Sequence, residues 1–518
     1  MTERVPLARW VVRGLLLFTL TFADLNDIWS PDTVPNALFA WTLLREGDVD
    51  YDEFTYALPV PPHTLVGGLM DLGMPRETYF FRTCGRPEPS SRAPLQRMSG
   101  PDLSSPRGPG GPPPPGPNDR VCSIFPPGIS LLALPVLAPF VIAGVPAADG
   151  GTIVRAGHLA AALIETIAAL LLWAVMRRFV SARWALALVL LYFLGTSVRT
   201  VSSQALWQHP GVHLALALAL WLTLRERVSV RRELLAGLVM GFAVAIRQTA
   251  ALIALGVARL PWPQAGWPPV VVVRPRAPVM FAAGAILGVL PLIAYNALAF
   301  GSPFEQGYGD KPFDVRTMWP GLYGLLLSPS RGLLVYEPWV AFALAAFALA
   351  WTKFGLVALR LRGLSLAWAG TLLLYASYVE WWGGRVFGPR FLDDLAPAAI
   401  VALAWGISQG LLARTWMRIA FWATAAWSWL LFNAAALVYD PAGWDTVPVN
   451  VNFDPSKLFS WADPQWLNVL SLLAALDPRL IAASLLSALV IALLLRLELH
   501  RGGQRCARAR RVSHPSEG

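Results

Sequence analysis

The sequence predicts an all-α protein that crosses a membrane many times, because apolar stretches recur along its whole length. Its 518 residues are 55% hydrophobic and only 14% charged, and the mean hydropathy is +0.51. Soluble globular proteins carry roughly 25% charged residues. Several apolar runs approach the ~20 residues that a helix needs to cross a bilayer. We therefore expect a polytopic membrane protein with about 11–13 transmembrane helices.

The distribution of arginine sets the expected orientation of these helices. The formal net charge is +10, and the arginines gather between apolar runs and near the end of the chain. Such a bias places the arginine-rich loops in the cytoplasm. We expect a multi-pass protein of a bacterial inner (plasma) membrane with both termini cytoplasmic. The same loops lack aromatic interleaving and any nucleic-acid motif, so nucleic acid is not an expected partner.

The first transmembrane helix is expected within residues 1–25. Arg4, Arg9 and Arg13 precede or enter its apolar run, as they would in a signal peptide. No small-residue cleavage site follows the run, so we interpret it as an uncleaved helix.

A large extracytoplasmic loop is expected at residues 26–154. Its residues 36–46 space Leu, Trp and Phe side chains as an amphipathic helix lying on the membrane does. The apolar run at 125–144 is interpreted as an interfacial or re-entrant helix, because a full span there would put the following arginines on the wrong side.

A Pro/Gly-rich insertion is predicted within this loop, at residues 84–120. Proline and glycine at this density do not build a core, so we expect it to be disordered. Cys84 and Cys122 flank it, while the third cysteine, Cys506, falls in the expected cytoplasmic tail. Either the flanking pair forms a disulfide that closes off the insertion, or both remain free thiols.

The remainder of the chain divides into a transmembrane bundle and a short end region. The bundle is expected at 155–438, an extracytoplasmic segment at 439–478, the last helix at 479–497 and a basic tail at 498–518. The helices expected within the bundle cover 155–176, 184–201, 207–224, a glycine-interrupted pair over 233–258, 277–300, 334–353, 364–381, 391–412 and 417–438.

Carboxylates follow the first helix directly, where it should emerge from the membrane. Asp27 and Asp32 lie in this stretch, and Asp24 lies just inside the apolar run. A carboxylate at that depth meets a lipid-borne substrate from one side and a soluble substrate from the other. It is therefore a candidate general base.

Three arginines lie on the expected outer side, where the positive-inside bias does not account for them. Arg331, Arg385 and Arg390 sit among glycines and prolines. A guanidinium in such a loop suits a phosphate, which it binds in a bidentate manner. The alternative is interfacial anchoring, with Trp382 in the aromatic belt and the arginines reaching lipid headgroups.

These motifs resemble the GT-C superfamily of membrane glycosyltransferases, which includes protein O-mannosyltransferases and lipid A aminoarabinose transferases. The resemblance rests on an Asp after the first helix, a large first outer loop and short motifs. The motifs are Ser30-Pro31-Asp32-Thr33-Val34-Pro35, Ser328-Pro329-Ser330-Arg331-Gly332, Trp382-Gly383-Gly384-Arg385 and Gly388-Pro389-Arg390.

The resemblance implies transfer of a sugar, with inversion, from a polyprenyl-phosphate donor to an extracytoplasmic glycan, lipid or protein. Asp32 matches the family's catalytic carboxylate by position, with Asp27 and Asp24 as nearby substitutes. Arg390, Arg385 and Arg331, in that order, would stabilise the departing phosphate. His209, Trp382 and Tyr308 complete the expected substrate-binding residues, although an interfacial helix cap suits the Gln208-His209-Pro210 motif better than an acceptor site does.

No cofactor is expected. Some relatives use a divalent cation and others none, and the sequence has no tight His/Asp spacing that would hold a metal firmly.

Two other classes of function remain open from the sequence. A transporter or flippase for an anionic lipid-linked substrate would use the same outer cations together with ionisable groups inside the membrane, such as Glu165 and Arg247. A scaffold without a site would not need acids and arginines gathered on the outer face. The absence of an internal repeat and this uneven distribution favour the enzyme.

Overall fold

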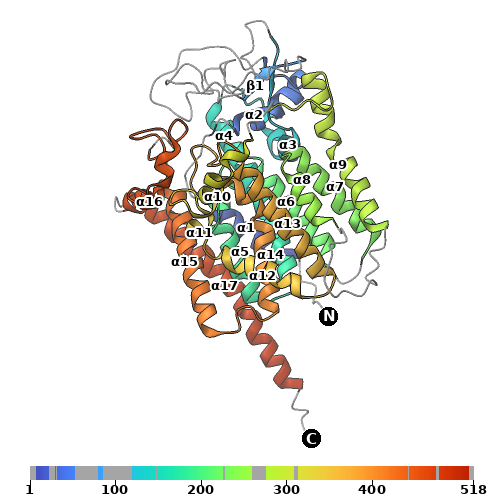
Figure 1. The fold of residues 1–518 in the computed structure, drawn as a ribbon. Coiled ribbons are helices and arrows are strands. Elements are labelled where there is room, and N and C mark those ends of the chain that lie inside the picture. Colours follow the sequence, from blue (N-terminus) through green and yellow to red (C-terminus); the bar gives the residue numbers. More distant parts are fainter. Residues whose placement is uncertain are drawn as a thin grey trace.

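The computed structural model describes residues 7–22, 30, 32–52, 80–85, 119–147, 149–225, 228–258, 276–308, 313–441, 443–473 and 478–512. Within these ranges helices make up nearly all of the regular structure (Figure 1). The described sheet has two antiparallel strands, β1 (Phe81–Thr83) and β2 (Val121–Ser123), with Arg82 opposite Cys122.

The helices follow the chain in the order of their numbers. Those of the first half are α1 (Leu7–Phe22), α2 (Val34–Trp41), α3 (Gly128–Ile142), α4 (Gly150–Met176), α5 (Ala182–Leu194), α6 (His209–Thr223), α7 (Val230–Ile246) and α8 (Ala250–Val257). Those of the second half are α9 (Arg276–Phe300), α10 (Met318–Leu327), α11 (Leu333–Tyr336), α12 (Val340–Thr352), α13 (Leu356–Ala376), α14 (Ala396–Ser408), α15 (Thr415–Val438), α16 (Gln465–Leu472) and α17 (Pro478–Val512). Short π or 3₁₀ turns join them at η1 (Thr42–Glu46), η3 (Val198–Ser202), η4 (Val315–Thr317), η5 (Arg390–Leu395) and η6 (Pro455–Phe459).

Six segments of the described chain are helical, long and apolar enough to cross a membrane. They are Gly150–Met176, Arg276–Phe300, Leu356–Ala376, Arg390–Ser408, Thr415–Val438 and Ile481–Glu498. Shorter apolar helices, α3, α5, α6 and α12, accompany them. The fold is thus all-α and polytopic, as the composition predicts.

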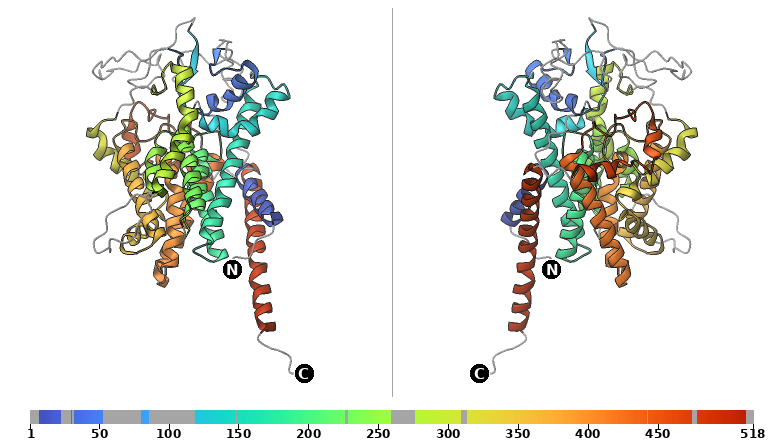
Figure 2. Two further views of the ribbon diagram at one scale, coloured as in Figure 1. Left: turned by 90° about the vertical axis from the view of Figure 1, so that its right-hand side faces the viewer. Right: turned by 90° about the vertical axis from the view of Figure 1, so that its left-hand side faces the viewer.

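The first and last helices pack side by side, and α1 begins at the end of the bundle where α17 finishes (Figure 2). Arg13 of α1 and Glu498 of α17 form a buried ion pair. The Arg13 guanidinium also lies over the Trp10 and Trp173 rings, 5.0 and 4.5 Å from their centroids. The strand β1 and helices α2 and α3 lie at the opposite end of the molecule (Figure 1).

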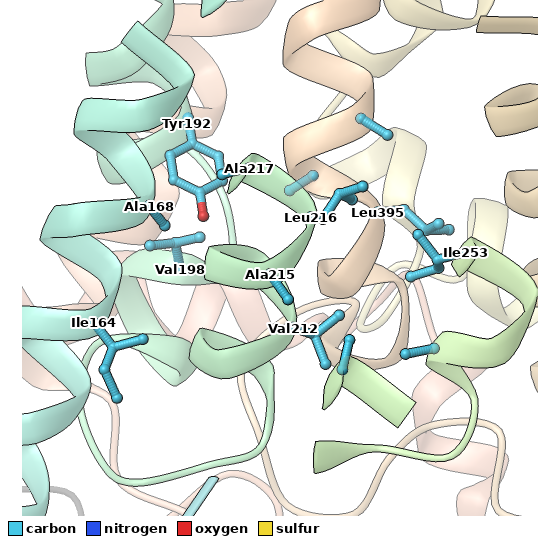
Figure 3. Packing of buried hydrophobic residues seen from close by; sticks show 14 of the residues in the cluster. Ile164, Ala168, Tyr192, Val198, Val212, Ala215, Leu216, Ala217, Ile253 and Leu395 are labelled. Carbon is cyan, nitrogen blue, oxygen red and sulfur yellow. The ribbon is translucent and has the colours of Figure 1, made fainter. Parts of the chain in front are cut away.

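The core is built around α6, which packs against α4, α7 and α8. Small buried side chains line α6, and Figure 3 shows Ala217 beside the Tyr192 ring, with Ala168 of α4 close by. Tyr192 of α5 is fully buried beside them. Small residues allow close helix approach, which drives association where lipid removes the hydrophobic effect between helices.

Four glycines bring α7 and α9 into backbone contact. A Cβ atom on Gly237 or Gly241 of α7 would lie 1.9 Å from Phe281 O or 2.1 Å from Ala285 O of α9. A Cβ atom on Gly284 or Gly288 of α9 would lie 2.1 Å from a carbonyl oxygen of α7. The two helices therefore interlock through paired G-x-x-x-G motifs.

The predicted helix boundaries hold for most of the bundle, with four departures. The span expected at 364–381 is found earlier along the chain, as α13 (Leu356–Ala376). The expected span at 184–201 is wrong as a single helix, because α5 ends at Leu194 and η3 follows after a Gly-Thr-Ser turn. The span at 334–353 is divided between α11 and α12, since Glu337 leaves the helical conformation before Pro338. Helix α10 was not expected at all.

The structure joins Cys84 to Cys122 as a disulfide, with their Cα atoms 5.3 Å apart. Of the two alternatives for these cysteines, the disulfide is therefore the one found. It lies beside the β1–β2 ribbon, and Cys84 N donates to Arg120 O. Most of the Pro/Gly insertion predicted at 84–120 lies outside the described residues.

The amphipathic helix expected at 36–46 is present as α2 and η1, but α2 is buried on all sides and not only along one apolar face. All eight residues of α2 are buried. Tyr51 OH donates to Pro35 O and Trp41 Nε1 donates to Val145 O, both at 2.9 Å. Because α3 and α4 pack around α2, it lies within the protein rather than on a membrane surface.

Candidate active site

The centre of the candidate site is an ion pair between Asp32 and Arg390. Asp32 lies two residues before α2, and Arg390 is the first residue of η5. The Arg390 Nη2 atom is 2.7 Å from Asp32 Oδ2, with side-chain exposures of 12% for Arg390 and 21% for Asp32. The pair is therefore half-buried, and part of each side chain stays exposed. Asp24 and Asp27, the other candidate bases, lie outside the described residues.

Three further contacts orient the Arg390 guanidinium. Its Nη1 atom donates to Gly383 O at 3.2 Å, and its Nε atom is 3.5 Å from His209 Nε2. The guanidinium carbon lies 3.8 Å from the centroid of the Trp207 ring. Stacking and hydrogen bonding together fix the orientation of the planar guanidinium.

His209 belongs to a buried network of hydrogen bonds and ion pairs. His209 Nδ1 is 2.8 Å from Asp394 Oδ1, and Arg247 Nε is 3.3 Å from Asp394 Oδ2. Arg247 also donates through Nη2 to Tyr375 OH at 2.7 Å. Buried charges are tolerated when they are paired and hydrogen-bonded. The network therefore connects α6, α7, α13 and η5 to the candidate site.

A second buried cluster lies next to it around His213. The His213 Nδ1 atom is 2.6 Å from Glu165 Oε1, and Tyr192 OH donates to Glu165 Oε2 at 2.9 Å. His213 Nε2 is 2.9 Å from Asp393 O, and Ser202 donates to the Asp393 carboxylate. The neighbouring residues Asp393 and Asp394 thus join the two clusters. Glu165 and Arg247, which are ionisable residues within apolar runs, both have partners here.

Tyr308 and Trp382 lie at the edges of the site. Tyr308 OH donates to Gln208 Oε1 at 3.4 Å, and burial raises the pKa of this phenol, so it stays neutral at physiological pH. Trp382 is buried, and its Nε1 atom donates to Asn452 Oδ1 at 3.1 Å. Trp382 therefore connects the Trp-Gly-Gly-Arg turn to the segment after α15.

Arg331 has a different environment from the other two arginines. It is 1% exposed, its Nη2 atom is 2.6 Å from Asp445 Oδ1, and its Nη1 atom donates to Gln465 Oε1 at 2.8 Å. Nη2 also donates to Gly384 O at 3.2 Å. Arg331 thus joins the segment 443–473 to the turn that carries Arg385, and its charge is balanced inside the protein.

Arg385 is exposed and has no hydrogen bond or ion pair with any described residue. It follows Gly383 and Gly384, whose φ angles of +75° and +80° suit glycine. Gly383 O accepts from Arg390, and Gly384 O accepts from Arg331. These two arginines therefore stabilise the turn that carries the exposed Arg385.

Sequence reasoning missed several residues that build this site. Asn36 Nδ2 donates to Asp32 O at 3.1 Å and to Leu206 O at 2.9 Å, and so holds α2 against the chain before α6. Trp207 stacks on Arg390 from the same segment. Its proximity to the Gln-His-Pro motif was the available signal, but a Trp near a helix start is usually an interfacial anchor.

Among the described residues, no group of three or more His, Cys, Asp or Glu side chains could hold a metal ion. Comparison of the chain with protein-family models, with curated proteins and with solved structures finds no significant match.

Proposed function

We propose that the chain is an integral membrane glycosyltransferase of the GT-C type, with about 11–13 spans and a site on the extracytoplasmic side. It would transfer a sugar from a polyprenyl-phosphate donor to an acceptor hydroxyl or amine with inversion. The observation that carries the proposal is the half-buried Asp32–Arg390 pair, in which a carboxylate oxygen and a guanidinium nitrogen lie 2.7 Å apart.

In the proposed reaction, the acceptor oxygen or nitrogen attacks the anomeric carbon of the donor sugar. The bond between that carbon and the phosphate oxygen breaks, and the polyprenyl phosphate leaves with the bonding electrons. Asp32 takes the proton from the acceptor as the new bond forms. Arg390 and Arg385 stabilise the negative charge that grows on the phosphate.

The surroundings of Arg390 allow it to pair with Asp32 before the donor binds and with the donor phosphate afterwards. When a phosphate draws one edge of the guanidinium from Asp32, the stacking on Trp207 and the bond to Gly383 O can keep the group in place. Asp32 is then released to act as a base next to the reacting carbon.

Release of polyprenyl phosphate from labelled polyprenyl-phosphate sugars tests the proposal. Purified protein in lipid should release it slowly by hydrolysis, or faster with an acceptor, and the Asp32→Asn variant should not. The matched control is Asp454→Asn, because Asp454 is an exposed aspartate that caps η6 and an asparagine can cap in its place.

One observation favours a second function, transport of an anionic lipid-linked substrate. The Glu165–His213–Asp393 cluster lies inside the helix bundle, and ionisable groups there are common in proton-coupled carriers. Proton-coupled uptake in proteoliposomes that is lost in Glu165→Gln, without release of polyprenyl phosphate, would favour transport over transfer.

A further inference from the structure

The segment between η3 and α6 carries two buried hydrogen-bond donors that the described protein does not satisfy. They are Trp207 Nε1 and Gln208 Nε2, on side chains that are 4% and 8% exposed. A buried donor without an acceptor destabilises the folded protein, because no hydrogen bond offsets its loss of contact with water. Two such groups on consecutive residues are therefore expected to meet acceptor atoms from outside the protein.

Both donors belong to the candidate site. The Trp207 ring stacks on the guanidinium that pairs with Asp32. Gln208 Oε1 accepts from Tyr308 OH, and this bond leaves the amide nitrogen as the unsatisfied end of the side chain.

The backbone around these donors is tied to Asp32. The Asn36 amide donates to Asp32 O and to Leu206 O, so one side chain fixes the base and the residue before Trp207. Leu206 also packs closely on α4, since a Cβ atom on Gly157 would lie 3.5 Å from Leu206 Cβ. The donors are therefore held at a set position relative to the base.

The chemistry of the donors indicates which part of a substrate they meet. The indole and amide N–H groups are uncharged, while the charged donors nearby are Arg390 and the exposed Arg385. Phosphate oxygens bind best to charged donors, and neutral N–H groups suit hydroxyl or ring oxygens.

We propose that Trp207 and Gln208 form a subsite for the sugar, in which their N–H groups donate to uncharged oxygens of a hexosyl or pentosyl group beside Asp32. This inference rests on the proposed glycosyl transfer and adds the residues that recognise the sugar. A site that hydrogen-bonds a substrate hydroxyl discriminates strongly against an analogue without it, because its own donors then stay unpaired.

The test compares the binding of two lipids to the full-length protein in nanodiscs. One is a polyprenyl-phosphate sugar, with the mannosyl and arabinosyl forms measured separately, and the other is bare polyprenyl phosphate. The ratio of the two Kd values isolates the contribution of the sugar from that of the phosphate and the lipid chain.

Two variants remove one donor each with little change in shape. Trp207→Phe retains a ring over Arg390 but loses the indole N–H, and Gln208→Met retains the length of the side chain but loses the amide. Trp41→Phe is the control, since its indole N–H is already satisfied by Val145 O away from the site. The thermal midpoint of each variant reports any loss of folding.

We expect the wild type to prefer a sugar-bearing lipid, and each variant to lose roughly tenfold of that preference, measured as the ratio of the two Kd values. Trp41→Phe should keep the preference. If both variants keep it, or weaken both lipids equally, the sugar subsite is refuted and glycosyl transfer stands. If the wild type prefers neither sugar, the subsite is refuted, whereas the proposed function is contradicted only if the wild type also releases no polyprenyl phosphate.

Discussion

Arg390 donates to Asp32 across 358 residues of sequence, with Nη2 and Oδ2 at 2.7 Å. This contact joins the chain before α2 to the start of η5, two regions that belong to different halves of the protein. The carboxylate is held by its partner yet stays 21% exposed. Complete burial would add a desolvation cost that the attraction between the two charges does not always offset, whereas this pair keeps part of each side chain exposed.

Arg385 should contribute to donor binding without contributing to stability. It is exposed and makes no ion pair with described residues. Arg385→Ala should weaken binding of polyprenyl phosphate on the order of tenfold, because a charge-assisted phosphate contact is lost. Its thermal midpoint should stay that of the wild type. Arg414→Ala, at an exposed arginine that precedes α15, should leave both quantities unchanged. Unchanged binding in Arg385→Ala would remove this residue from the site.

Arg331 should behave in the opposite way. Its buried pair with Asp445 joins the segment 443–473 to the Gly383–Gly384 turn. Arg331→Met leaves the Asp445 carboxylate buried without its cation, and should cost about 3–5 kcal/mol of unfolding free energy. The double variant with Asp445→Leu should recover part of this loss. Denaturation in detergent measures both, and additive losses in the double variant would show that the two side chains do not interact.

The contact between α7 and α9 should not tolerate a methyl group. In Gly284→Ala the new Cβ would lie 2.1 Å from Leu234 O, so the helices must separate, at a cost of about 1–3 kcal/mol. Gly370→Ala in α13 is the matched control, because its Cβ would meet only Leu252 methyl groups, the nearest at 3.8 Å. That variant should be neutral or slightly stabilised. Equal thermal midpoints for the two variants would contradict the interlocked packing.

The disulfide between Cys84 and Cys122 should stabilise the region around β1 and β2. The cysteines are 38 residues apart, and closing a loop of this size contributes on the order of 3–4 kcal/mol in the loop-entropy model. A reductant should lower the thermal midpoint of the wild type but not that of the Cys84→Ser, Cys122→Ser double variant. Alkylation of both cysteines before any reduction would show that they are free thiols.

The helices could be predicted well because apolar runs of bilayer length are a local signal. The helix breaks that the sequence did not predict also have local causes. The Gly195-Thr196-Ser197 turn and the Glu337-Pro338 pair lie within apolar runs, and they break the helix without lowering the average hydropathy enough to be noticed. The glycines within 233–258 predict an interruption between two helices, but Gly237 and Gly241 lie inside α7 and form part of its contact surface with α9.

The site could be predicted only as a set of residue types. Asp32, Arg331 and Arg390 were all named from their positions near helix ends, but which carboxylate meets which arginine depends on long-range packing. Arg331 pairs with Asp445, which lies in a segment whose role the sequence did not predict. Trp207 and Asn36 act through neighbours distant in sequence, and the Gln-His-Pro motif beside Trp207 does not distinguish this residue from an interfacial anchor.

The central claim is tested most directly by release of polyprenyl phosphate from a labelled polyprenyl-phosphate sugar, measured for wild type, Asp32→Asn and Asp454→Asn in lipid. We predict release by the wild type and by Asp454→Asn, and a loss of at least ~100-fold in Asp32→Asn, the scale of one general base. Donor binding by Asp32→Asn should persist. Wild-type rates of release from Asp32→Asn would contradict the role of Asp32. No release by any of the three proteins, with donor binding intact, would contradict glycosyl transfer itself.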